Sequence, residues 1–149
     1  MTERFKMGIV LPDSYKALYG PDAIIRSSGI PTLQQEMIKI RASQINGCAY
    51  CVNLHAKAAR KLGETEERIY LMSVWRESPN IFSDEEQLLL EMVEEITLIH
   101  QHGLSDRLYE KAISLWGEER TARVMMAIIN INSWNRIGVG TKLHPDKSR

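Results

Sequence analysis

The chain has 149 residues, of which 44% are hydrophobic and 26% are charged, a balance typical of a globular protein rather than a disordered or fibrous one. Its 19 basic residues balance 19 acidic ones, so no overall field attracts nucleic acid or an acidic membrane surface. The N-terminus has no apolar leader, and no uncharged stretch approaches the ~18 residues that cross a bilayer. We therefore expect one cytoplasmic domain over residues 1–149, without nucleic acid or a membrane as a partner.

Helix start and stop signals predict an all-α fold, because no segment keeps the strict alternation of a half-buried strand. Near the N-terminus, Asp13 is expected to cap a short turn over residues 15–19. The Gly20-Pro21 pair is then expected to restart the chain into a helix over residues 22–28.

The next two predicted helices are joined by a short stop at Asn46-Gly47. Apolar residues recur at helical spacing over residues 32–45 and again over residues 48–62. Gly63 follows the second helix, in the position that a left-handed cap favours. Glu36 therefore lies inside the first helix, and the second begins at a cysteine.

Capping residues and glycines also divide the second half of the chain. Ser83 and Glu86 have the spacing of a capping box, which makes the helix that follows them the clearest in the sequence. The helices expected in this part cover residues 65–76, 83–102 and 105–116.

The last helix, expected over residues 118–138, is apolar on more than one face. A helix of this kind is buried on both sides. Its second apolar face is buried either by the rest of the same domain or by another subunit, and we favour a subunit interface. The tail over residues 141–149 is expected to be frayed.

Cys48 and Cys51 are the only two cysteines, and two residues separate them. In a cytosolic protein such a pair is typical of a redox-active or metal-binding site. At about 100° per residue, Cys48, Cys51 and His55 project from one sector of about 60° on the helix. The free N–H groups of the first helical turn favour a thiolate there, so we expect a lowered pKa at one of the two thiols.

The neighbouring polar residues suggest how such a pair would react. His55 can accept the proton of Cys51 or pass one to a leaving oxygen, and Glu36 could orient and charge the imidazole. Two cysteines at this spacing can close a disulfide with little backbone movement. A peroxidase cycle follows, in which one cysteine becomes a sulfenic acid, the other condenses with it, and an external dithiol reduces the disulfide.

The pattern of Glu36, eleven residues, Cys48-Ala49-Tyr50-Cys51, three residues and His55 resembles the signature of the alkylhydroperoxidase D (AhpD) and carboxymuconolactone decarboxylase-like superfamily. The resemblance covers roughly residues 15–138. It implies an AhpD-like multi-helix bundle with the Cys-x-x-Cys motif at a helix N-terminus.

The same resemblance implies roles for these residues. Cys51 would attack an organic hydroperoxide and carry the lowered pKa, Cys48 would resolve the product and face the reductant, and Glu36 with His55 would form a proton relay. The reductant would be a dithiol or a thioredoxin-like or lipoyl protein. The resemblance also implies a homo-oligomer, a trimer or hexamer, and we expect neither a cofactor nor a metal.

Two alternatives remain open from the sequence. A zinc-stabilised interaction module could use Cys48, Cys51, His55 and Glu36 as ligands, although there is no second Cys or Cys/His pair. A decarboxylase-like lyase is disfavoured, because members of that branch lack the cysteine pair and no cluster of Lys and Arg suggests a basic pocket. Tyr50 departs from the best-characterised peroxidases, which can carry a histidine before the second cysteine, and we expect a slower peroxidase.

Overall fold

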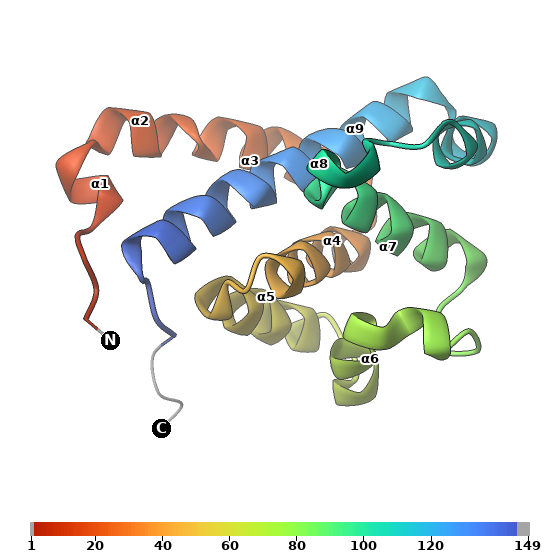
Figure 1. Cartoon of the computed structure of the whole chain (residues 1–149), viewed down its shortest axis with the longest axis horizontal. Coiled ribbons are helices and arrows are strands. Elements are labelled where there is room, and N and C mark those ends of the chain that lie inside the picture. The colour runs from red at the N-terminus through yellow and green to blue at the C-terminus, as the bar shows by residue number, and fades with distance from the viewer. Residues whose placement is uncertain (1, 146–149) are drawn as a thin grey trace.

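The computed structural model describes residues 2–145, which form helices and no strand (Figure 1). This confirms the all-α prediction. None of the helices in this range combines the length and apolar character that crossing a membrane requires. The elements are α1 (Met7–Val10), α2 (Pro12–Ala17), α3 (Tyr19–Arg26), α4 (Thr32–Ile45), α5 (Ala49–Lys61), α6 (Glu66–Leu71), the 3-10 helix η1 (Met72–Glu77), α7 (Asp84–Thr97), α8 (Ile99–His102) and α9 (Asp106–Thr141).

Helix α4 lies at the centre of the bundle and packs against α5, α7 and α9 (Figure 1). Its residues Met37, Ile38 and Ile40 have no exposed surface, so more than one face of the helix is buried. The helix that carries Glu36 is therefore fixed on several sides. The two ends of the described chain also meet, since the N–H of Arg4 donates to the carbonyl of Thr141 over 2.9 Å.

The N-terminal prediction was wrong in two respects. Asp13 lies inside α2, which begins with Pro12 at its first position, and Gly20-Pro21 lies in the first turn of α3 instead of separating two segments. Proline is tolerated in a first helical turn, where its missing N–H has no intrahelical partner. Helix α1 was not predicted.

Two later helices end sooner than predicted. The segment capped by Thr65 leaves α-helical geometry after α6 and continues as η1, in which Val74 has non-helical torsion angles. The helix with the capping box of Ser83 and Glu86 is confirmed, but α7 ends at Thr97, and Leu98 separates it from α8. β-branched residues at 96, 97 and 99 weaken helix propensity at this break.

Helix α9 contains both of the last two predicted helices. Gly117, with a φ of 75° and a ψ of 173°, breaks the helix where the sequence predicts a stop. The helix continues to Thr141, so the predicted fraying does not begin there, and residues 146–149 lie outside the described residues.

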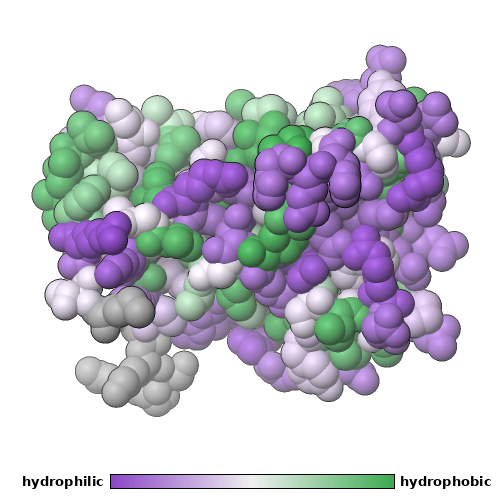
Figure 2. All heavy atoms as spheres, in the orientation of Figure 1, coloured by the Kyte–Doolittle hydropathy of each residue, from purple (hydrophilic) through white to green (hydrophobic). Residues whose placement is uncertain are grey.

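The apolar faces of α9 are covered only in part by this chain. Val124, Ile128 and Ile131 are buried in the core, whereas Met126 and Ile129 remain about half exposed. Figure 2 shows further apolar surface over the N-terminal helices. The large hydrophobic side chains that are exposed in this part of the chain include Ile9, Val10, Leu11 and Ile24.

Candidate functional site

The two cysteines lie at the start of α5, with Cys48 at the N-cap position and Cys51 in the first turn. Gly47, with a φ of 67°, allows the chain to turn from α4 into α5. The sulfur atoms are free thiols that lie 2.6 Å apart, within hydrogen-bonding distance. Cys48 is 1% exposed and Cys51 is 5% exposed. The motif therefore forms a buried dithiol.

The two thiols differ in acidity. The hydrogen bond shared with Cys51 lowers the pKa of Cys48 to about 7 against the effect of burial, with smaller contributions from backbone N–H groups and the Asn135 side chain. The same shared hydrogen bond, together with burial, raises the pKa of Cys51. The lower pKa therefore belongs to Cys48, which corrects the expectation that it belongs to Cys51.

Glu36 on α4 contacts both His55 and Lys39 beside the dithiol. Its Oε2 lies 2.8 Å from Nδ1 of His55, and its Oε1 accepts from Nζ of Lys39 over 2.8 Å. Burial alone would raise the pKa of Glu36, but the hydrogen bonds from His55 and Lys39 lower it below its ordinary value. Since a carboxylate only accepts hydrogen bonds, Nδ1 of His55 carries hydrogen, and Nε2 is left to exchange a proton with a reactant.

A layer of buried amides lies beneath the dithiol. Asn135 on α9 is completely buried, donates to Oγ of Ser43 over 2.9 Å, and accepts from Nδ2 of Asn46 over 3.0 Å. Asn46 also donates to Asn132 over 2.9 Å. These bonds tie the turn before the cysteines to α9.

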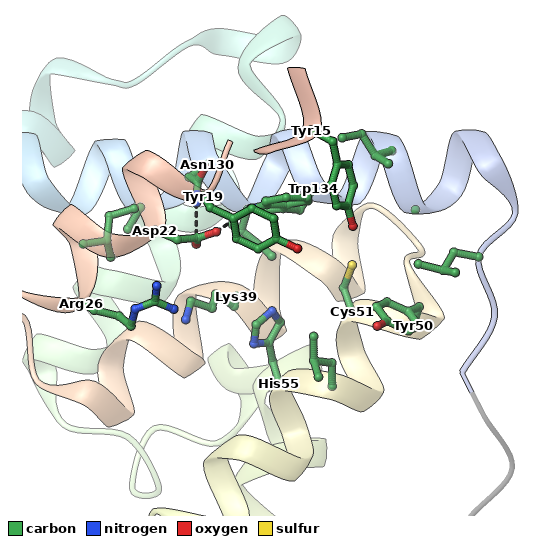
Figure 3. A pocket seen from close by; sticks show the side chains of 17 residues that line it. Tyr15, Tyr19, Asp22, Arg26, Lys39, Tyr50, Cys51, His55, Asn130 and Trp134 are labelled. Carbon is green, nitrogen blue, oxygen red and sulfur yellow. Dashed lines mark hydrogen bonds between the residues drawn. The ribbon is translucent and has the colours of Figure 1, made fainter. Parts of the chain in front are cut away.

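Cys51 and His55 line a cavity of about 230 Å³ between α3, α5 and α9 (Figure 3). Cys48 is not part of the lining. Tyr15, Tyr19 and Trp134 form an aromatic wall, in which the Trp134 ring centroid lies 5.1 Å from that of Tyr15 and 5.0 Å from that of Tyr19. A molecule in the cavity would therefore meet Cys51 before Cys48.

The structure brings Glu36 and His55 into contact and Cys48 and Cys51 into contact, as the sequence predicted. Sequence reasoning missed Lys39, although its place three residues after Glu36 puts both on one helix face. It did not single out Trp134 either, because nothing local in the sequence indicates that this residue lines a cavity.

The zinc alternative required the four motif side chains to converge on one ion. Within residues 2–145, no group of three or more His, Cys, Asp and Glu side chains is arranged to hold a metal. The carboxylate of Glu36 is instead bound to His55 and Lys39.

Comparisons with known proteins place the chain in a family. The profile of the carboxymuconolactone decarboxylase family matches residues 12–95. The chain is 39% identical to the uncharacterized protein YdfG of Bacillus subtilis over 93% of this chain and 94% of that protein.

Two solved structures resemble the fold. One, from Agrobacterium tumefaciens, is a protein of unknown function proposed to be the antioxidant defence protein AhpD, with 38% identity and a TM-score of 0.93 over 98% of this chain and 100% of that one. The other is an uncharacterized peroxidase-related protein from Silicibacter sp. TM1040, with 22% identity and a TM-score of 0.75 over 90% of this chain and 69% of that one. The first similarity confirms the expected AhpD-like bundle.

Proposed function

Because the chain belongs to the carboxymuconolactone decarboxylase family and has an AhpD-like fold, we propose that it is a thiol-dependent peroxidase that reduces organic hydroperoxides. The observation that carries the proposal is the buried dithiol, with one sulfur facing a cavity that His55 also lines. Two thiols that share a hydrogen bond and lie beside a carboxylate-bound imidazole provide both a nucleophile and a path for protons.

In the first step, Cys51 loses its proton to Nε2 of His55, and Cys48 remains a thiolate. The Cys51 thiolate attacks the outer oxygen of the hydroperoxide, and an S–O bond forms as the O–O bond breaks. The departing alkoxide takes a proton from His55, which Glu36 holds in position. The peroxide is thereby reduced to an alcohol, and Cys51 is oxidised to a sulfenic acid.

In the second step, the Cys48 thiolate attacks the sulfenic sulfur and the oxygen leaves as water after protonation. The resulting disulfide is reduced by an external dithiol, which supplies two electrons and two protons. A small dithiol or a thioredoxin-like or lipoyl protein fits this role. We also propose that the protein acts as a homo-oligomer, a trimer or hexamer, and that it works in the cytoplasm.

The test is consumption of cumene hydroperoxide by the purified, metal-analysed chain with dithiothreitol or dihydrolipoamide as the reductant. We expect repeated turnover, loss of turnover in Cys51→Ser, and less than one equivalent of zinc. Turnover that persists in Cys51→Ser would contradict the peroxidase assignment. One tightly bound zinc per chain, with unfolding on chelation, would favour the interaction module instead.

A further inference from the structure

The cavity beside Cys51 is lined in part by an exposed cation that has no partner among the described residues. Arg26, in the last turn of α3, lines the cavity, and its guanidinium makes no hydrogen bond or ion pair within residues 2–145. Asp22, one turn earlier, is already engaged. Its carboxylate oxygens accept from Nδ2 of Asn130 over 2.7 Å and from Nε1 of Trp134 over 2.9 Å. The donors of Arg26 therefore remain available to a ligand.

Lys39 brings a second positive charge to the same cavity. Figure 3 shows the charged ends of Arg26 and Lys39 on the same side of the cavity, reaching toward it from different helices. The charge of Lys39 is matched by Glu36 at 2.8 Å, whereas that of Arg26 is not matched. That these two cations line the same cavity could not be predicted from the sequence, because Arg26 and Lys39 lie on separate helices. An anion placed beside Arg26 would gain a charge-assisted hydrogen bond without displacing an existing one.

The rest of the cavity lining suits the apolar part of a ligand. The rings of Tyr15, Tyr19 and Trp134 form one wall, and Ile131 adds an aliphatic side chain to the lining. A cavity with aromatic walls and a few placed polar groups is typical of a site for a small organic molecule.

We propose that the cavity binds an organic hydroperoxide that carries one carboxylate, with the acid group at Arg26 and the peroxide group at Cys51. The inference rests on the proposed peroxidase function and names its substrate class. Asp22 restricts the ligand to a single negative charge, because its carboxylate lies in the same cavity and would repel a second anionic group. Arg26 is a specificity residue in this scheme, since it lies apart from the reacting atoms.

Binding can be measured without any turnover, using two matched ligands that lack a peroxide. The probes are 4-isopropylbenzoate and the neutral 4-isopropylbenzamide, titrated into the full chain by calorimetry at low ionic strength. We expect the wild type to bind the carboxylate ~10-fold more tightly than the amide, as for one charge-assisted hydrogen bond. Arg26→Gln should abolish this preference, and Arg26→Lys should retain part of it.

The matched control is Arg107→Gln, which removes the same charge from an exposed site on α9 that does not line the cavity. It should keep the full preference. Equal binding of the two probes by the wild type, or an unchanged preference in Arg26→Gln, would overturn the inference.

A second comparison separates this inference from the peroxidase proposal. With cumene hydroperoxide and its para-carboxylated form as substrates, kcat/KM should favour the acid by a similar factor in the wild type but not in Arg26→Gln. Equal turnover of the two peroxides together with equal binding overturns the anion site alone. A carboxylate preference in binding without reduction of either peroxide supports the anion site and overturns the peroxidase proposal.

Discussion

Gly138 on α9 lies directly against the sulfur of Cys48. A Cβ atom built at Gly138 would lie 2.9 Å from Cys48 Sγ and 3.7 Å from Cys51 Sγ. Contacts under 3.0 Å do not occur without displacement of one partner, and the Cys48 sulfur is already held by Cys51 and buried. The absence of a side chain at this position therefore makes room for the dithiol.

We expect Gly138→Ala to push the two sulfur atoms apart and to lower the rate of disulfide formation. It should also lower the free energy of unfolding by ~1–3 kcal/mol, as an overpacked core does. The control is Gly140→Ala, two residues along the same helix, where a Cβ meets no atom within 4 Å. That variant should gain up to ~1 kcal/mol from helix propensity and keep its activity. Equal behaviour of the two variants in urea unfolding and peroxide turnover would contradict this account.

Asn135 is expected to tune the thiolate. Its side chain is one of the groups that lower the pKa of Cys48, after the larger effect of Cys51. In Asn135→Ala the pKa of Cys48 should rise above about 7, so the rate of alkylation by iodoacetamide should reach half its maximum at a higher pH. The variant should also lose ~1–3 kcal/mol of stability, because Ser43 and Asn46 each lose a buried hydrogen-bond partner.

The control for this prediction is Asn53→Ala, which removes an amide from α5 at a half-buried position outside the cavity beside Cys51. Its alkylation profile should match that of the wild type. If Asn135→Ala gives the same profile as well, Asn135 has no influence on the thiols.

Part of the fold and of the candidate site could be predicted from the sequence. The contacts of Glu36 with His55 and of Cys48 with Cys51 were predictable, because each pair is placed by one or two regular helices. Helix boundaries were predicted correctly where a capping residue or a glycine marks them, as at Ser83 and Gly117. The prediction was wrong near Leu98, where the sequence has no such residue.

Gly138 and Asn135 could not be predicted from local pattern. Both contact residues that lie about 90 positions earlier in the sequence. Gly138 lies against Cys48, and Asn135 contacts Ser43 at a separation of 92 residues. Helical periodicity shows which face of α9 is apolar but not which residue of that face meets the start of α5. Arg26 was also missed, because helical periodicity within α3 does not show that its end lies beside α5.

Glu36→Gln is expected to lower peroxide turnover on the order of 100-fold, because the imidazole of His55 loses the carboxylate that holds it. The native state lowers the pKa of Glu36 below its ordinary value of 4.5. Its ionised form therefore stabilises the fold above that value, and the contribution disappears as the pH falls through the lowered native pKa.

Urea unfolding of the wild type and Glu36→Gln between pH 7 and pH 3 measures this contribution. The difference in unfolding free energy should be largest near neutral pH and should shrink in acid. Glu67→Gln, which changes an exposed carboxylate outside any ion pair within residues 2–145, serves as the control and should show no such trend. A difference that is independent of pH would mean that Glu36 is not ionised in the native state.

The exposed apolar surface leads to a prediction about assembly. Ile9 on α1 is 75% exposed and Ile24 on α3 is 71% exposed, and their burial between subunits would remove apolar area from water. We expect the wild type to sediment as an oligomer, and Ile9→Lys and Ile24→Lys to shift it toward the monomer. The control is Leu115→Lys on α9, at an apolar residue that is 55% exposed but lies outside the N-terminal helices. This variant should sediment as the wild type does. A monomeric wild type at tens of micromolar would contradict the proposed oligomer.

The most direct test of the dithiol mechanism is the intact mass of the reduced, metal-free protein before and after one equivalent of cumene hydroperoxide. The wild type should lose two hydrogens and regain them with dithiothreitol, and Cys48→Ser should gain one oxygen, trapped on Cys51 as a sulfenic acid. Cys51→Ser should remain unmodified at the same peroxide concentration. An unchanged wild-type mass, or an oxygen retained on Cys48 in Cys51→Ser with none on Cys51 in Cys48→Ser, would contradict the account.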